Sequence, residues 1–238
     1  MGRAYEVRKA SIQKNGMAKA KTYSTFAKEI YLAAKKGIPD LDSNIILKRL
    51  VEKAKKAQVP SDIIQRAIEK AKGNGQEEYT SVTYEGFGPG ASTLIIKCLT
   101  DNVNRTVSYV RAAFNKVHKN LGVTNSVSYN YDYLGVVSFN YDNEELVLDK
   151  LIENNIEPID FENEDGVITI SVNPTDESKL KDTIESIIPN VEYLFDEVGM
   201  FPKEKITLEG EDKEKFELLL SLLEDVEDVS HIYHNVEL

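Results

Sequence analysis

Residues 134–196, LGVVSFNYDNEELVLDKLIENNIEPIDFENEDGVITISVNPTDESKLKDTIESIIPNVEYLFD, decide the fold class of this chain of 238 residues. Short stretches in it are rich in β-branched and aromatic residues and alternate with the period of strands, while others have helical spacing. The strand-like stretches are 134–140, 158–161, 167–172 and 191–196, and the helix-like ones are 144–154 and 176–187. Their order, βαββαβ, is that of the split ferredoxin-like unit.

The sequence on either side of this unit also predicts strands and helices. Strands are expected at 81–85, 92–99, 126–131, 205–208 and 230–235, and helices at 105–119 and around Phe216, Leu219, Leu220 and Leu223. The C-terminal stretch is too short to be a domain by itself, but together with the stretch before residue 134 it again gives two βαβ halves. We therefore predict a second ferredoxin-like domain that the first one interrupts, with a linear arrangement as the alternative.

Ahead of these strands the sequence predicts a small helical bundle. Gly37 stands where a left-handed C-terminal cap belongs, the next helix follows a cap at Ser43 or Asn44, and a third begins at Pro60. The residues expected to face its core are Phe26, Ile30, Ala33, Ile46, Leu47, Leu50, Ala54, Ile64, Ala67, Ile68 and Ala71.

The predicted fold is therefore α+β, an N-terminal helical bundle followed by two ferredoxin-like α/β domains, the second inserted in the first. The helical domain covers residues 1–75, the discontinuous α/β domain 79–133 plus 201–238, and the inserted α/β domain 134–200.

The net charge of −11 averages two opposite regions. Residues 1–75 hold 17 Lys and Arg against 7 Asp and Glu, whereas residues 76–133 are balanced, so all the negative excess follows Leu134. Such asymmetry suggests a basic module for a polyanion joined to an acidic one that maintains solubility.

Several motifs that would indicate an enzyme or a metal-binding protein are not supported by the sequence around them. Gly86, Gly88 and Ala91 fit a relaxed dinucleotide fingerprint, but a strand follows them where the fingerprint requires a helix. An acidic loop that resembles a calcium site has Phe161 where a ligand is needed. Cys98 lies in an apolar strand, as inert buried thiols do. We expect no catalytic residue, no metal, no cofactor and no small-molecule substrate.

The sequence also indicates the cellular compartment of the protein. No stretch reaches the roughly 20 apolar residues of a membrane helix, and the charged start of the chain is unlike a secretory signal. A single cysteine fits a reducing compartment. We expect a cytoplasmic protein without membrane contact.

The basic residues form the candidate nucleic-acid interface. Lysine-rich helices often present only a solvated face, but clustering in one domain of an acidic protein favours contacts to a phosphate backbone. The candidates are Arg3, Arg8, Lys9, Lys14, Lys19 and Lys21 near the start, and Lys48, Arg49, Lys53 and Lys56, which are expected with Lys55 on the solvent side of their helix.

The stretch TDNVNRT, residues 100–106, is the most specific candidate. Asn102 and Asn104 tolerate a turn, and Asn104 can cap the helix that follows. Arg105 in the first turn opposes the helix dipole, so we expect it to bind phosphate or a base edge, and Arg111 continues a polar stripe.

A glycine-rich loop precedes this stretch. Gly86, Gly88 and Gly90 are expected to form a tight, bare loop beside the Arg105 turn. Such a loop would allow close approach by the backbone of a nucleic acid.

The sequence resembles the YebC family, and its opening, MGRAYE, is similar to the YeeN-type branch. The segments that carry the resemblance include AKEIYLAAKKG, YEGFGPGA, TDNVNRTVSYVRAAFNK, SVSY and the terminal YHNV. His118, Lys119 and Asn125 stand where the family usually has glycine. The resemblance implies three domains, one helical and two α/β, and a non-enzymatic cytoplasmic protein.

The sequence is compatible with two functions. The family resemblance implies a DNA-binding transcriptional regulator, or alternatively a translation factor that acts on the ribosome to relieve stalling on proline-rich stretches. We predict a non-enzymatic nucleic-acid-binding regulator of gene expression whose partner is DNA or ribosomal RNA, and docking on the ribosome belongs to the second function.

Overall fold

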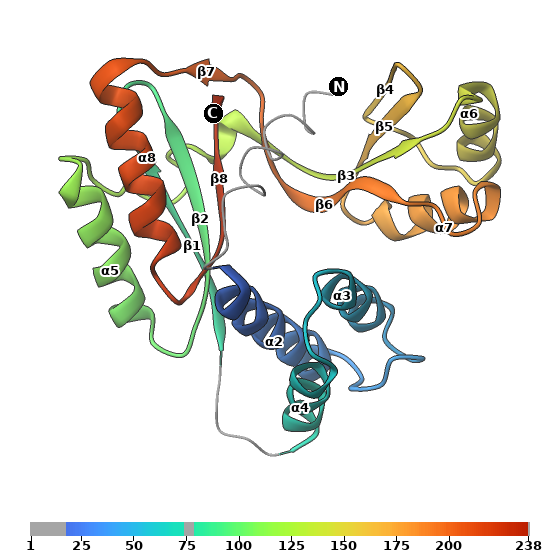
Figure 1. Ribbon diagram of the computed structural model, residues 1–238, viewed down its shortest axis with the longest axis horizontal. Helices are drawn as coiled ribbons and strands as arrows, with labels where there is room; N and C mark the ends of the chain where they lie inside the picture. The colour runs from blue at the N-terminus through green and yellow to red at the C-terminus, as the bar shows by residue number, and fades with distance from the viewer. Residues whose placement is uncertain (1–17, 74–78, 238) are drawn as a thin grey trace.

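The computed structural model describes residues 18–73 and 79–237, with side chains from residue 21 onward. The described residues form three units, each with a core of its own (Figure 1). We name them the helical unit (18–73), the split unit (79–133 and 201–237) and the inserted unit (134–200). The α+β class predicted from the sequence is confirmed, while the domain boundaries themselves stay a prediction.

The helical unit consists of α2 (Ala18–Lys36), α3 (Ile45–Lys56) and α4 (Ser61–Lys72). Ile30, Leu47 and Ile64 lie at the centre of its core. Asn44 caps α3, because its side chain accepts a hydrogen bond from the Leu47 amide at 3.0 Å. Ile46 is 71% exposed, so its predicted place in the core is wrong. One position off the apolar stripe of a helix is enough to turn a side chain outward.

Gly37 ends α2, but it does not adopt the left-handed conformation that the sequence predicted. A Cβ atom at this position would lie 2.6 Å from the Asn44 side-chain nitrogen. That nitrogen donates hydrogen bonds to the carbonyl oxygens of Ala33 and Ile38. Glycine is required here for the close approach of a side chain that satisfies the end of the helix.

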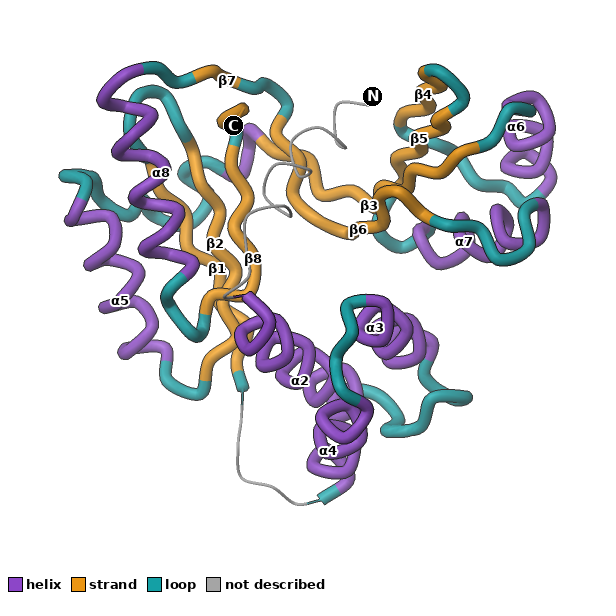
Figure 2. The backbone as a smooth tube through the Cα atoms, in the orientation of Figure 1, coloured by secondary structure: helices purple, strands orange, loops and turns teal. Residues whose placement is uncertain are grey.

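The split unit is built on a three-stranded antiparallel sheet in the order β1-β2-β8. Its elements are β1 (Thr80–Phe87), β2 (Thr93–Thr100), α5 (Val103–Lys116), β7 (Ile206–Thr207), α8 (Gly210–Glu224), β8 (Val229–His234) and β9 (Val236–Glu237). Helices α5 and α8 lie on the same side of this sheet (Figures 1 and 2), where Phe114 and Phe216 are fully buried. Because β8 pairs with β2, the C-terminal stretch belongs to the same sheet as residues 93–100, contrary to the linear alternative.

The strand predicted at 126–131 is wrong. These residues form a 3-10 turn, η1 (Ser128–Asn130), before β3 begins at Tyr131. The carboxylate of Glu85, which is 6% exposed, accepts hydrogen bonds from the amides of Asn125, Val127 and Ser128 at 2.8–2.9 Å. Backbone donors that a strand would give to its neighbour are taken by this one side chain.

The inserted unit has the predicted ferredoxin-like order. Its elements are β3 (Tyr131–Asn140), α6 (Glu144–Glu153), β4 (Asp160–Glu164), β5 (Val167–Val172), α7 (Glu177–Ile187) and β6 (Tyr193–Pro202). The sheet is antiparallel in the order β4-β5-β3-β6, which places the third strand beside the first. Asp165 and Gly166 join β4 and β5 with positive φ at both positions, as a tight hairpin turn requires.

Strands β3 and β6 extend beyond the inserted unit. They pair from Phe139 and Tyr193 to Tyr131 and Pro202, with one shift of register between Ser138 and Phe139. As a two-stranded ribbon they run between the inserted and split units (Figure 2). Gly135 lies against α7, since a Cβ atom there would be 2.7 Å from the Glu177 side chain. The ribbon therefore belongs to the packing of the inserted unit as well as to its connection.

Candidate nucleic-acid interface

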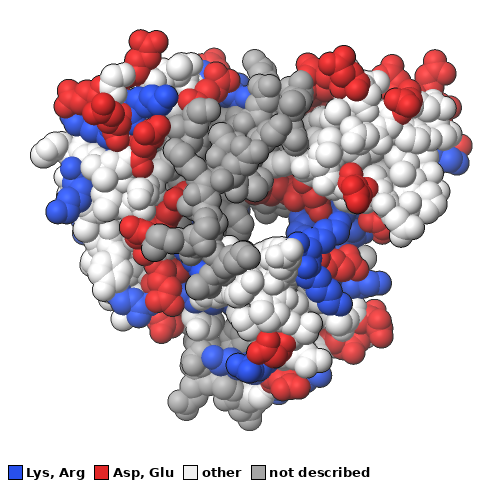
Figure 3. Space-filling model, in the orientation of Figure 1, with Lys and Arg blue, Asp and Glu red and all other residues white. Residues whose placement is uncertain are grey.

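Helix α3 carries three cations on one face, and we call Arg49, Lys53 and Lys56 the α3 stripe. Their spacing of four and three residues aligns them along the helix. Buried Leu47, which belongs to the core of the helical unit, lies elsewhere on the helix. In the structure the stripe is turned toward α7 and β6 of the inserted unit, where basic side chains meet acidic ones (Figure 3).

Arg49 makes the most extensive contact of the stripe. Its Nε donates to the Ser178 hydroxyl at 2.8 Å, and a terminal nitrogen donates to the Ser178 carbonyl oxygen at 2.9 Å. The same nitrogen lies 2.6 Å from an Asp182 carboxylate oxygen. The Arg49 side chain is 13% exposed, so its guanidinium is held between α3 and the first turns of α7.

Lys53 and Lys56 continue the contact toward β6. The Lys53 ammonium lies 3.1 Å from a carboxylate oxygen of Asp196, and the Lys56 ammonium lies 5.6 Å from the centre of the Tyr193 ring. Asp196 also accepts a hydrogen bond of 2.6 Å from buried Lys181. Burial alone would raise the pKa of Asp196, but Lys53 and Lys181 outweigh it and keep that pKa below its usual value.

This arrangement corrects the sequence interpretation of α3. Lys48, Lys55 and Lys56 are exposed as expected, but Arg49 and Lys53 are not on a solvent-facing side. They contact the inserted unit because that unit carries complementary carboxylates at Asp182 and Asp196. Nothing in the local pattern of α3 could have indicated this partner, which lies more than 120 residues further along the chain.

Lys21 lies in α2, which contacts the split unit. Its ammonium donates to the carbonyl oxygens of Glu224, the last residue of α8, and Val226, two residues beyond it. Burial lowers the pKa of Lys21, although Glu224 and Asp225 act in the opposite direction. A cation at the C-terminal end of a helix is stabilising, so Lys21 has a structural role there.

Arg105 also has a structural role that the sequence did not indicate. A terminal nitrogen of Arg105 lies 2.8 Å from Asp101 and 2.9 Å from Asp228. Asn102 is the N-cap of α5, since its side chain accepts from the Arg105 amide at 3.0 Å, so the predicted cap at Asn104 is wrong. The interpretation of Arg105 as a residue without structural advantage is also wrong.

Asp228 is the centre of this contact and was missed by sequence reasoning. Its side chain is 5% exposed and accepts from Arg105, from the Thr106 hydroxyl at 2.8 Å and from Lys28 at 3.3 Å. Burial would raise the pKa of Asp228, but these hydrogen bonds lower it overall. Asp228 follows a run of acidic residues typical of a solvated loop, and only its place directly before an apolar strand hinted at burial.

The glycine-rich loop is packed against protein. A Cβ atom at Gly86 would lie 2.5 Å from the Phe114 ring, and one at Gly88 would lie 2.5 Å from the Ser92 hydroxyl. Gly90 has φ +60°, and a Cβ there would meet Leu208 at 2.6 Å. Gly86 and Gly88 are buried and permit close packing inside the split unit, whereas Gly90 is exposed, so the loop is not bare along its length as the sequence predicted.

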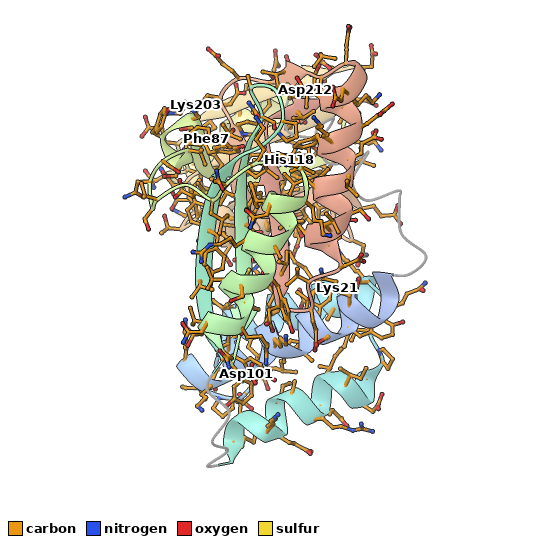
Figure 4. The ribbon with its side chains drawn as sticks, turned by 90° about the vertical axis from the view of Figure 1, so that its left-hand side faces the viewer. Lys21, Phe87, Asp101, His118, Lys203 and Asp212 are labelled. Carbon is orange, nitrogen blue, oxygen red and sulfur yellow. The ribbon has the colours of Figure 1, made fainter. Side chains whose placement is uncertain are left out.

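The loop is also far from the Arg105 turn. Strand β2 runs from the loop to Thr100, so its eight residues separate the two features by roughly 25 Å. Figure 4 shows this separation, with Phe87 at one end of the sheet and Asp101 at the other. The predicted juxtaposition of the two motifs is wrong because a hairpin places its turn and its open end at opposite edges.

The remaining candidates are either exposed or outside the described residues. Asn104 and Arg111 are exposed on α5. The residues Arg3, Arg8, Lys9 and Lys14 and the side chain of Lys19 lie outside the described part of the chain. The structure therefore brings together the α3 stripe. Lys21 and Arg105 both contact the connection between α8 and β8, at Glu224, Val226 and Asp228, whereas the glycine loop lies at the other end of the sheet.

Cys98 is the single cysteine of the chain. As predicted, it is buried in an apolar strand, and burial raises the pKa of its thiol to about 12, which disfavours the reactive thiolate. Within residues 18–73 and 79–237 no group of three His, Cys, Asp or Glu side chains is arranged to hold a metal ion. No helix in the same ranges is long and apolar enough to cross a membrane.

Two family models match the chain. The model described as TACO1/YebC protein N-terminal domain matches residues 3–74, and the model described as TACO1/YebC second and third domain matches residues 79–236. The chain belongs to the TACO1/YebC family. The resemblance inferred from the sequence motifs is thereby confirmed.

Relatives in this family are similar over their full length. The chain is 44% identical to a probable transcriptional regulatory protein of Vibrio parahaemolyticus, covering all of both chains. It is also 44% identical to a probable transcriptional regulatory protein of Acholeplasma laidlawii, over 99% of this chain and 98% of the relative. The crystal structure of a conserved hypothetical protein from Aquifex aeolicus is 31% identical, with a TM-score of 0.76 over 93% of this chain and 91% of that one.

Of the three positions where the resemblance implied glycine, two keep the backbone that glycine favours, and Lys119 does not. His118 has φ 57° and Asn125 has φ 64°, both in the left-handed region. Asparagine tolerates this region better than most residues, and His118 terminates α5 where a left-handed residue is common. The loops of this TACO1/YebC chain therefore retain their turns without glycine.

Proposed function

We propose that the protein is a regulator of gene expression that binds nucleic acid, acting as a transcriptional regulator on DNA and without catalysis. The observation that carries the proposal is the separation of charge, with 17 Lys and Arg against 7 Asp and Glu in residues 1–75 of a chain of net charge −11. Lysine and arginine side chains neutralise phosphates and release counterions, which supplies most of the affinity for a nucleic-acid backbone. The name of the relatives supports the same function.

Exposed cations of the helical unit are the first candidates for phosphate contacts. Lys48 and Lys55 are seven residues apart on α3, so they share a face that is not the one turned to the inserted unit. Lysine ammonium groups contact phosphate as point charges and do little to distinguish bases. We expect an affinity that depends strongly on salt and weakly on sequence.

Fluorescence anisotropy with a short labelled DNA duplex tests the proposal, using the full chain at several salt concentrations. The variant Lys48→Gln/Lys55→Gln should bind more weakly, and its log–log salt dependence should be shallower by about 0.9 for each phosphate that is no longer neutralised. Lys179→Gln/Lys213→Gln is the matched control, because it removes the same charge from exposed positions outside the helical unit.

Two results would contradict the proposal. One is the absence of binding by the wild-type chain at low salt, and the other is an equal loss of affinity in both double variants. Single-stranded and ribosomal RNA are measured in parallel with the duplex. Binding to RNA and cosedimentation with ribosomes, without binding to duplex DNA, would replace the transcriptional function by a translational one.

A further inference from the structure

The contact between the α3 stripe and the inserted unit uses the side chains of a phosphate-binding surface. Arg49 directs both its Nε and a terminal nitrogen at oxygen atoms of Ser178 and Asp182, at 2.6–2.9 Å. A guanidinium group binds two phosphate oxygens with the same planar arrangement of donors. The groups that Arg49 contacts therefore occupy positions that phosphate oxygens could take.

The surface opposite the α3 stripe has the charge of a polyanion. Residues 134–200 contain 17 Asp and Glu against 3 Lys and Arg. Asp182 forms an ion pair with Arg49, and a carboxylate oxygen of Asp196 lies 3.1 Å from the Lys53 ammonium. Two carboxylates thus face two successive cations of the stripe, as neighbouring phosphates would along a nucleic-acid strand.

The interface itself is polar. The core of the helical unit contains only residues of 23–79, and the core of the inserted unit contains only residues of 137–193. Among the described residues no apolar cluster spans the contact between the two units. Interfaces held by charged pairs and hydrogen bonds separate more readily than apolar ones, and the pairs weaken with salt.

We propose that this contact is autoinhibitory, with Asp182 and Asp196 standing in for phosphates on the α3 stripe until a nucleic acid displaces them. The proposal rests on the proposed function, and it assigns the inserted unit the role of an internal competitor. Binding then exposes Arg49 and Lys53 to the ligand and separates α3 from α7. Because the competitor is part of the same chain, its effective concentration is high. It therefore lowers the affinity of the α3 stripe for every nucleic acid by the same factor.

Asp182→Asn tests the competition, since it removes one carboxylate and keeps the shape of the side chain. Asp182 is 63% exposed, so the variant is expected to fold normally. Asp149→Asn is the matched control, because Asp149 is exposed on α6 and the loss of net charge is the same. Measured by anisotropy with a labelled DNA duplex, Asp182→Asn should bind about two- to five-fold more tightly than Asp149→Asn, the factor that one partly exposed ion pair contributes.

A distance measurement tests the opening directly. Glu52→Cys on α3 and Ile152→Cys on α6 are exposed positions outside the contact, and buried Cys98 does not compete for a spin label. Saturating DNA duplex should lengthen the distance between the two labels. Asp182→Lys, which places a cation against Arg49, should lengthen it without any DNA.

The outcomes separate this inference from the proposed function. If the wild-type chain and Asp182→Lys both fail to bind the duplex and RNA at low salt, the proposed function is wrong and the competition falls with it. If the wild-type chain binds but Asp182→Asn is no tighter than Asp149→Asn, or if the label distance stays unchanged on saturation, only the autoinhibitory contact is overturned.

Discussion

Asp228→Asn is the substitution we expect to destabilise the protein most clearly, because the Asp228 side chain joins helices α5 and α2 to the start of β8. Its carboxylate accepts hydrogen bonds from Arg105 and Thr106 of α5 and from Lys28 of α2. An asparagine keeps the shape of the side chain but removes its charge. It also replaces one acceptor oxygen by an NH2 group, which cannot accept hydrogen bonds from the Arg105, Thr106 or Lys28 donors.

The magnitude follows from the burial of these groups. Removing one partner of a buried ion pair costs about 3–5 kcal/mol, and the Lys28 and Asp228 side chains are only 11% and 5% exposed. Arg105 is 41% exposed and can be solvated in the absence of its partner, so we expect a decrease in stability of about 2–3 kcal/mol. In a chain of this size each kcal/mol corresponds to roughly 2–4 °C in Tm.

Urea and thermal denaturation followed by circular dichroism measure the effect. Glu227→Gln is the control, since it makes the same change of charge at the preceding, exposed residue and should cost less than about 0.5 kcal/mol. Arg105→Ala should lower the Tm in the same direction as Asp228→Asn. If Asp228→Asn and Glu227→Gln have equal midpoints, the contact contributes nothing and the reasoning is refuted.

The dependence on pH provides a second check of the same prediction. The pKa of Asp228 is lowered in the folded state, so the unfolded chain binds more protons as pH falls toward 3.8, the usual pKa of the group. The stabilisation is therefore complete above that pKa and is lost as pH falls through the lower folded-state value. The difference in stability between wild type and Asp228→Asn should shrink in the same acidic range.

Three further predictions concern separate positions. Burial raises the pKa of Glu29 from 4.5 to about 7, although Lys53 and Lys97 oppose the shift, so stability should fall by up to about 3 kcal/mol as pH rises from 4.5 through 7. In denaturation at several pH values, Glu29→Gln should remove this decrease in the free energy of unfolding. A variant with the pH profile of the wild type would contradict the prediction. Gly86→Ala should cost about 1–3 kcal/mol in Tm measurements, because its Cβ would overlap the Phe114 ring, whereas Gly73→Ala, with no atom closer than 3.7 Å, should be nearly neutral. Cys98 should react with a thiol reagent only after denaturant is added, and rapid labelling of the native chain would show that the strand opens.

Local periodicity was enough to predict most of the fold. The βαββαβ pattern predicted the order of strands and helices along the inserted unit, because alternation and helical spacing report directly on burial. The split unit was harder, since the pairing of β2 with β8 joins segments separated by the whole insertion. The η1 turn was missed because one distant carboxylate, that of Glu85, takes the backbone donors of the segment.

The candidate site was predicted less well than the fold. Residue type and spacing identified the cations of α3, but no local feature indicated that Arg49 and Lys53 contact carboxylates in the inserted unit. The same applies to Arg105, whose main partner Asp228 is distant in sequence. A free cation and a paired cation have the same local pattern, and only the tertiary structure distinguishes them.

The ribbon of β3 and β6 also constrains the order in which the chain can fold during synthesis. One edge of β2 pairs with β1, and the other pairs with β8, which begins at Val229. During synthesis this second edge therefore stays unpaired until the chain is almost complete. Pairing of Tyr131 with Pro202 brings the two ends of the insertion together and shortens by more than half the loop that must close between β2 and β8. That shortening lowers the entropic cost of closure by roughly 0.6 kcal/mol. The nascent chain therefore gains most by folding its insertion before the domain that surrounds it.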